Sequence, residues 1–179
     1  LHHLGEVTYF SPLADTSLPD AGFVYLPGGY PELYLAALSA NRQMLQSIRR
    51  YVESGGKLLA ECGGMMYLCD EIRDKNGDVY PMAGVLHQSA TMENMKLRLG
   101  YRTLLYNETR LKGHEFHYSR LVEQQNPLPS CAVAYTAKGV ETDTPLYHYK
   151  NVWAGYTHLY WADPVGNEWF TKFVIDGNT

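Results

Sequence analysis

A cysteine at an expected strand-to-helix junction is the side chain of this sequence best placed for covalent chemistry. Cys62 follows the apolar run Lys57–Glu61 and precedes Gly63 and Gly64, in the segment KLLAECGGMMYL. A thiol on a sharp turn at a strand end is exposed, lies near a helix N-terminus that lowers its pKa, and has the next N–H available for an oxyanion. The pattern indicates a nucleophile; the alternative is a buried structural cysteine.

Two other segments could complete a site of this kind. Gly28 and Gly29 come directly after the apolar run Gly22–Leu26, and their bare backbone could offer a further N–H donor to a tetrahedral intermediate. A thiol nucleophile also needs a base, and His158, in the late segment GYTHLYW, is the candidate. The alternative for His158 is a structural histidine.

A pair of histidines in the segment GHEFHYSRL invites a metal interpretation. On a strand, however, His114 and His117 would point to opposite faces, while Glu115 and His117 would share one. No third ligand is apparent in the sequence, and zinc sites require three or four protein ligands. We therefore predict no metal site.

The elements that must position these residues fall into two halves. In the first half we expect a strand at Glu6–Phe10, a strand at Gly22–Leu26, an amphipathic helix from Asn41 to Gly55 and a buried strand at Lys57–Glu61. A tight Gly-Gly turn and a short helix reaching Ile72 follow. This alternation predicts a parallel sheet covered by helices, with ligands at the carboxyl ends of the strands. Further strands are expected at 85–92, 99–106, 113–121, 132–137, 146–149 and 152–156, mainly antiparallel, followed by a helix at 163–176 with Pro164 in its first position.

Size and composition narrow the class of protein. The 179 residues fit one domain, and 15 basic against 19 acidic side chains do not predict a nucleic-acid-binding surface. No apolar run approaches the roughly 20 residues that span a bilayer, so we expect no membrane partner. Three cysteines without a CxxC pair argue against a disulfide framework and favour the cytoplasm.

Five motifs together resemble a known family. The sequence is similar, in the order and spacing of these motifs, to the glutamine amidotransferase domain of cobyrinate a,c-diamide synthases. The motifs are LPGGYPELY (26–34), AECGGMMYL (60–68), LGYR (99–102), GHEFHYSRL (113–121) and GYTHLYW (155–161). The resemblance covers essentially the whole chain. It implies an α/β, three-layer class I glutamine amidotransferase (flavodoxin-like) fold, whose mixed sheet is parallel in its N-terminal half and more antiparallel in its C-terminal half.

The same resemblance implies roles for the candidate residues. Cys62 would attack the side-chain amide of L-glutamine to form a thioester, and His158 would activate the thiol and protonate the departing ammonia. Gly28, Gly29 and Gly63 would be the oxyanion and substrate-binding residues. The histidines and the glutamate of GHEFHYSRL would line the glutamine pocket or a docking surface, or would pack as structural residues.

The resemblance also implies a larger enzyme. Relatives carry an upstream synthetase domain that uses ATP and magnesium to activate carboxylates of a corrinoid. Ammonia then converts the a and c acetate side chains of cobyrinate or hydrogenobyrinate to amides, a step of cobalamin biosynthesis. No GxxxxGK[ST] loop occurs in these residues, so we expect no cofactor in this chain. We expect residues 1–179 to form a single amidotransferase domain that lacks its first strand and the ATP-binding domain.

Two alternatives and one open question accompany this interpretation. The chain could be the glutaminase domain of a related amidating ligase, such as nickel sirohydrochlorin a,c-diamide synthase, or a catalytically inactive domain that binds a partner. Many class I amidotransferases have an acid two residues after the catalytic histidine, where this sequence has Tyr160. The resemblance therefore does not say which group orients His158.

Overall fold

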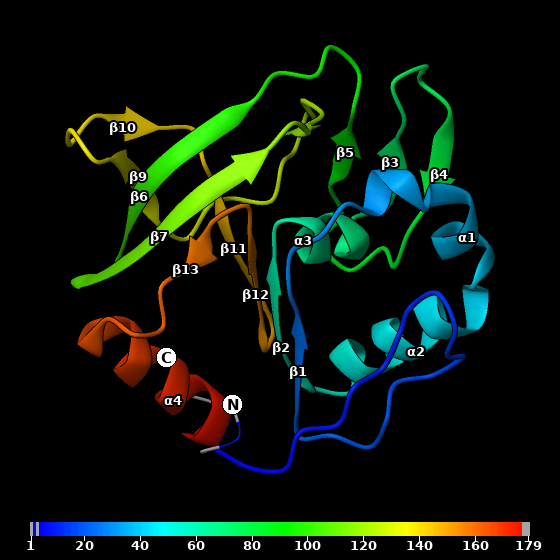
Figure 1. Cartoon of the computed structure of the whole chain (residues 1–179), viewed down its shortest axis with the longest axis horizontal. Coiled ribbons are helices and arrows are strands. Elements are labelled where there is room, and N and C mark those ends of the chain that lie inside the picture. Colours follow the sequence, from blue (N-terminus) through cyan, green and yellow to red (C-terminus); the bar gives the residue numbers. More distant parts are fainter. Residues whose placement is uncertain (1, 3, 177–179) are drawn as a thin grey trace.

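The computed structural model describes residues 2 and 4–176, and a central four-stranded sheet organises them. Its strands lie in the order β1 (Phe23–Leu26), β2 (Lys57–Glu61), β12 (Val152–Gly155) and β11 (Leu146–Tyr149). β1, β2 and β12 are parallel, and β11 is antiparallel to β12. The predicted parallel N-terminal half is therefore confirmed, and Figure 1 shows this sheet at the centre of the molecule.

The two faces of the central sheet bury different cores, since side chains alternate along a strand. Leu58 and Ala60 pack with one face of α2 (Arg42–Glu53) and with α3 (Gly63–Leu68), near α1 (Leu35–Ala40) and the short 3-10 helix η1 (Pro31–Leu33). Leu59 and Trp153 instead pack against α4 (Pro164–Asp176). Helices therefore lie on both sides of the sheet, as Figure 1 shows, in the predicted α/β arrangement.

The C-terminal half supplies a second, antiparallel sheet that covers the α4 side of the core. Its order is β10 (Glu141–Thr142), β9 (Val133–Thr136), β6 (Arg98–Tyr106), β7 (Thr109–His117) and β13 (His158–Leu159). A third sheet has the order β4 (Val79–Pro81), β3 (Glu71–Arg73), β5 (Ser89–Thr91) and β8 (Arg120–Leu121). The expected antiparallel second half is confirmed, although its strands join separate sheets.

Several expected elements have different bounds in the structure. The expected strand at 85–92 is limited to β5, and the one at 113–121 is divided into β7 and β8. The helix expected to reach Ile72 ends at Leu68, because Ile72 pairs with Tyr80 and Ala90 in the third sheet. The Gly-Gly pair, expected to form a turn, makes the first turn of α3. Backbone pairing partners and close packing overrode the local preferences at these positions.

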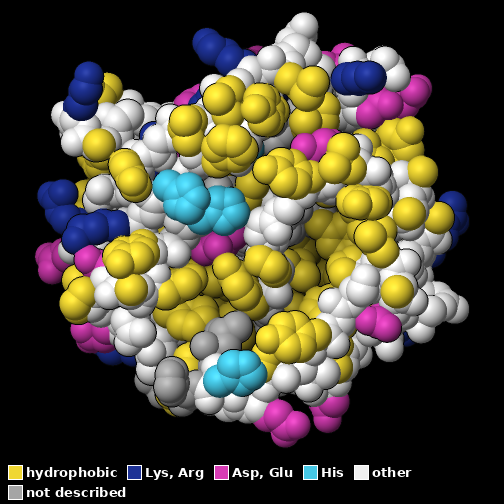
Figure 2. Space-filling view, viewed as in Figure 1, with side chains coloured by type: hydrophobic (Ala, Val, Ile, Leu, Met, Phe, Trp, Pro, Cys, Tyr) yellow, Lys and Arg dark blue, Asp and Glu magenta, His cyan; other side chains and the backbone are white. Residues whose placement is uncertain are grey.

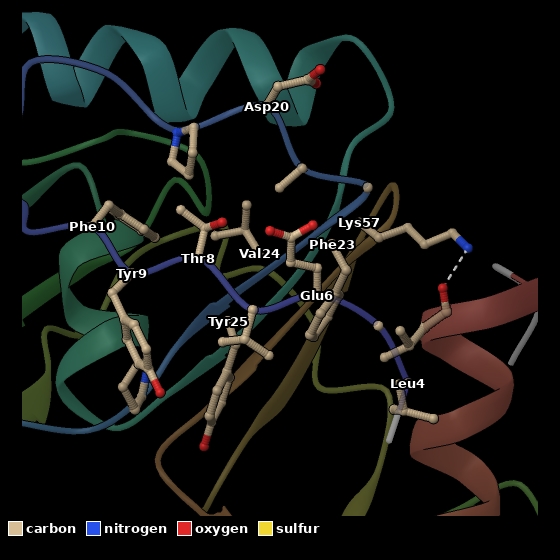
Figure 3. A pocket seen from close by; sticks show the side chains of 17 residues that line it. Leu4, Glu6, Thr8, Tyr9, Phe10, Asp20, Phe23, Val24, Tyr25 and Lys57 are labelled. Carbon is tan, nitrogen blue, oxygen red and sulfur yellow. Dashed lines mark hydrogen bonds between the residues drawn. The ribbon is translucent and has the colours of Figure 1, made fainter. Parts of the chain in front are cut away.

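The strand expected at Glu6–Phe10 is not formed. This segment lines, together with Pro19–Tyr25, a groove of about 720 Å³, which Figure 3 shows beside β1, the end strand of the central sheet. A strand exists only where its backbone N–H and C=O groups meet those of a neighbour. The segment therefore forms no strand, although its residue types favour one.

The helices contain no membrane-crossing candidate in the described residues. None of them is both long enough and apolar enough to span a bilayer.

Candidate active site

Cys62 forms the junction between β2 and α3. Its N–H donates to the Gly155 carbonyl at 2.8 Å, and its own carbonyl accepts from the Met66 N–H at 3.0 Å. The backbone thus passes from the sheet to the helix at one residue, which has φ 49° and ψ −110°. A positive φ costs a non-glycine residue free energy, so this sharp turn is a strained conformation of the kind that concentrates at functional sites.

The thiol lies beneath the end of β7 rather than on the open surface. Cys62 is only 5% exposed, and its Sγ lies 3.9 Å from the Phe116 carbonyl oxygen. The expectation of an exposed nucleophile is therefore wrong for this structure, because the second sheet covers the mouth of the turn.

Glycines allow the turns around Cys62 to come into contact. A Cβ on Gly64 would lie 2.2 Å from the Leu26 carbonyl oxygen, and one on Gly63 would lie 2.7 Å from the Gly29 carbonyl oxygen. The absence of side chains therefore lets α3 begin directly against the end of β1. The Gly63 N–H belongs to the first turn of α3, where N–H groups have no intrahelical acceptor. Gly28, Gly29 and Gly63, predicted as oxyanion and substrate-binding residues, are brought to one place.

His158 enters this site from β13. Its backbone is paired opposite His114 of β7, and a Cβ on Gly28 would lie 2.2 Å from its Cε1 atom. Its side chain is 25% exposed. The contacts with Cys62 and, after it, with Glu61 raise the pKa of His158 to about 9. The structure therefore unites Cys62 and His158, which are far apart in the sequence, while their catalytic roles remain predictions.

Glu61 is a residue of the site that the sequence interpretation missed. One carboxylate oxygen, Oε2, lies 3.6 Å from His158 Nδ1 and accepts a hydrogen bond from the Tyr25 hydroxyl at 2.7 Å. The other, Oε1, accepts from the Leu159 N–H at 3.0 Å. Glu61 is 3% exposed, whereas Tyr160, in the position where an acid is often found, is 59% exposed. An acidic residue at the buried end of an apolar strand is a signal that could have found Glu61.

The three candidates of the GHEFHYSRL segment divide between the faces of β7. The His114 ring stacks on the His158 ring with centroids 5.1 Å apart, and Figure 2 shows histidine side chains together over β7 and β13. Glu115 is fully buried and lies 2.8 Å from the Arg102 guanidinium. The predicted division of faces is confirmed by this alternating burial.

His117 packs as a buried neutral side chain. Its Nδ1 lies 2.9 Å from the Ser119 carbonyl oxygen, and its ring stacks on Tyr156 with centroids 3.8 Å apart. Burial lowers the pKa of His117, so the neutral imidazole donates this hydrogen bond near pH 7. Within the described chain no cluster of three or more His, Cys, Asp or Glu side chains could hold a metal ion.

The arrangement is suited to acyl transfer. A thiol on a strained turn contacts an imidazole, a buried carboxylate lies 3.6 Å from Nδ1 of that imidazole, and the glycine turns at Gly28-Gly29 and Gly63 are packed together beside them. Nucleophile, base, orienting group and oxyanion donors are the parts required for attack on a carbonyl carbon.

Known proteins are similar to this chain in sequence. A hydrogenobyrinate a,c-diamide synthase of Pseudomonas aeruginosa is 39% identical over 166 residues, covering 89% of this chain and 36% of that protein. A cobyrinate a,c-diamide synthase of Fusobacterium nucleatum is 38% identical over 169 residues, covering 89% and 37%. This chain thus spans little more than a third of the length of these curated relatives.

Solved structures agree at the level of the fold. A crystal structure of a glutamine amidotransferase superposes with a TM-score of 0.56 at 16% identity, covering 86% of this chain and 78% of that one. The structure of PurLQS from Thermotoga maritima gives a TM-score of 0.53 at 17% identity, covering 82% and 72%. The family described as the CobB/CobQ-like glutamine amidotransferase domain matches residues 1–165. On this match and the identities above, the chain belongs to the CobB/CobQ-like glutamine amidotransferase family.

Proposed function

We propose that this chain hydrolyses glutamine and supplies the ammonia for amidation of the a and c side chains of cobyrinate or hydrogenobyrinate. The observation that carries the proposal is that Cys62, on its strained turn, lies in one site with His158, whose Nδ1 is 3.6 Å from the carboxylate of Glu61, the residue before Cys62. Membership of an amidotransferase family and relatives named as a,c-diamide synthases support the substrate and the acceptor. The domain is thus the glutaminase part of a carbon–nitrogen ligase in cobalamin biosynthesis.

The first half-reaction forms a thioester. Cys62 passes its proton to His158, and Sγ attacks the carbonyl carbon of the glutamine amide. The raised pKa of His158 favours the imidazolium form that this transfer creates. N–H groups of Gly63 and of the Gly28-Gly29 turn stabilise the oxyanion. The C–N bond then breaks, and the imidazolium gives its proton to the leaving nitrogen, which departs as ammonia.

The second half-reaction releases glutamate. Neutral His158 accepts a proton from a water molecule, whose oxygen attacks the thioester carbon. The C–S bond breaks, which frees glutamic acid and leaves the Cys62 thiolate beside the protonated His158. The new carboxyl group then loses its proton to solvent or to ammonia, and the site returns to its starting state.

The partner of this domain is an ATP-binding synthetase domain. The relatives are almost three times as long as the region matched here, which leaves room in them for such a domain. ATP and magnesium would bind there, and the corrinoid would be activated there. Three free cysteines support a cytoplasmic location.

The proposal also names the class of molecule that accepts the ammonia. Relatives named for cobyrinate and for hydrogenobyrinate match this chain with nearly equal identity, 38% and 39%. We therefore propose a corrinoid of either metal state. Purified acceptors, compared in the amidation assay of the full-length protein, would distinguish these two from nickel sirohydrochlorin.

The central test is Cys62→Ala in the full-length protein. Glutamate release in the presence of ATP and corrinoid should be abolished, while amidation driven by free ammonia should persist. Cys131→Ala, which changes a half-buried thiol outside the site, serves as the matched control. Undiminished glutamate release by Cys62→Ala would exclude the thioester mechanism, and a wild-type protein without glutaminase activity would favour the inactive partner-binding domain.

A further inference from the structure

We propose that Glu61, the residue immediately before the nucleophile, is the positioning residue that holds His158 in its working orientation. The inference rests on the proposed function, since it names the group that prepares the base of that reaction. It assigns to β2 a role that the resemblance leaves open, because Tyr160 stands where an acid is often found.

The path of β2 explains how two adjacent residues reach the same imidazole. Leu59 and Glu61 are two residues apart, so they share the face of the sheet that is covered by the second sheet. β13, which carries His158, belongs to that second sheet. The sharp turn at Cys62 ends the strand alternation and turns the thiol toward the imidazole. Glu61 and Cys62, adjacent in the chain, therefore both contact His158.

The carboxylate of Glu61 is itself held in place. The Tyr25 hydroxyl of β1 and the Leu159 N–H of β13 each donate to one of its oxygens, at 2.7 and 3.0 Å. Burial and then the charge of Glu61 raise the pKa of Tyr25, so the hydroxyl stays protonated as a donor. The same carboxylate thus fixes the backbone of β13 and, through Oε2 at 3.6 Å from Nδ1, the imidazole beside it.

The other groups that face His158 do not supply a fixed negative charge. His114 of β7 stacks on its ring, and Gly28 presents only backbone. Cys62 is the reacting group, whose charge is used up when the thioester forms. In the described chain, Glu61 is the acidic side chain paired with His158, and it is not consumed in either half-reaction. A buried partner on the second nitrogen fixes the tautomer and ring orientation of a catalytic histidine.

The test combines turnover with a property of His158 itself. Glu61→Gln in the full-length protein keeps the size of the side chain and an acceptor for the Leu159 N–H, but removes the charge. We expect kcat for glutamate release to fall by about 10- to 100-fold, with the KM for glutamine changed by less than about threefold. The pKa of His158, followed by NMR of its ring protons, should fall from its raised value.

Two further variants keep the test decisive. Tyr25→Phe leaves the Glu61 side chain in place but removes one of the two hydrogen bonds that hold it. We expect kcat to fall, but by less than in Glu61→Gln. This variant also tests the inference if Glu61→Gln does not fold. Tyr160→Phe should leave both kcat and the pKa of His158 unchanged, because that side chain is exposed.

The result that would overturn the inference is a folded Glu61→Gln protein with kcat and the pKa of His158 both unchanged. A loss of activity in Tyr160→Phe, with Glu61→Gln unaffected, would place the orienting group at Tyr160 instead. The NMR measurement needs no turnover. A wild-type protein that releases no glutamate would therefore refute the proposed function, while the effect of Glu61 on His158 could still be measured.

Discussion

A methyl group added at Gly28 should displace His158, the proposed catalytic base, without removing any functional group. The Cβ of Gly28→Ala would lie 2.2 Å from Cε1, 3.0 Å from Nε2 and 3.3 Å from Nδ1 of His158. Ordinary contacts of a Cβ begin at 3.4 Å, so the ring must move by about 3.4 − 2.2 = 1.2 Å if the turn stays in place. Gly28 has no positive φ, so alanine fits its backbone conformation.

This displacement has a predictable catalytic cost. A misplacement of about 1 Å in a catalytic group lowers rates by about 100-fold, which corresponds to about 2.7 kcal/mol of transition-state free energy. We therefore expect kcat for glutamate release by Gly28→Ala to fall by about 100-fold. The backbone N–H of residue 28 is retained, so the loss would report the position of His158 and not a missing hydrogen bond.

The assay compares glutamate release by the full-length variants with the rate at which a glutamine-like electrophile, 6-diazo-5-oxo-L-norleucine, labels Cys62. Gly22→Ala is the control, because no atom lies within 4 Å of its added Cβ and the residue precedes β1. Both variants should unfold at temperatures close to that of the wild type. Glutamate release by Gly28→Ala within threefold of the wild type would refute the packing argument.

Two further predictions concern the buried polar residues of the second sheet. Arg102→Met removes the partner of the fully buried Glu115 carboxylate. We expect a loss of about 3–5 kcal/mol in the free energy of unfolding, measured by urea titration. A loss below about 1 kcal/mol would mean that the pair contributes little to stability. His117 has a lowered pKa, so the unfolded chain binds a proton more readily than the folded chain, and stability should fall as pH decreases through the ordinary histidine pKa of about 6.5. Urea titrations at pH 7.5 and 5.5 should show that the free energy of unfolding changes less with pH in His117→Gln than in the wild type. An equal change in both proteins would contradict the assignment of His117 as a buried neutral side chain.

Local patterns predicted much of the fold and the central pair of the site. Apolar periodicity located α2, and the Gly-Gly stop after it agrees with Gly55 at φ 92°. Alternation along β7 predicted correctly that Glu115 and His117 share a buried face. These predictions succeeded because they depend on the periodicity of one segment and on the conformations that glycine permits.

Predictions failed where a partner from a distant segment decides the outcome. Glu6–Phe10 has the composition of a strand, but it lines a groove beside β1 and pairs with no neighbouring strand. Ile72 has the position of a helical residue, but two neighbouring strands pair with it. Intrinsic propensities amount to less than about 1 kcal/mol per residue, so tertiary hydrogen bonds and packing override them.

The sequence by itself determined that a cysteine stands between a buried strand and two glycines, and that a late histidine is available as a base. Only the tertiary structure decided which acid accompanies that histidine. Glu61 precedes Cys62 in the chain and reaches His158 because β2 directs it toward the sheet that carries β13. Which distant side chains meet depends on how sheets stack, and stacking is set by the burial of whole faces and not by any single motif.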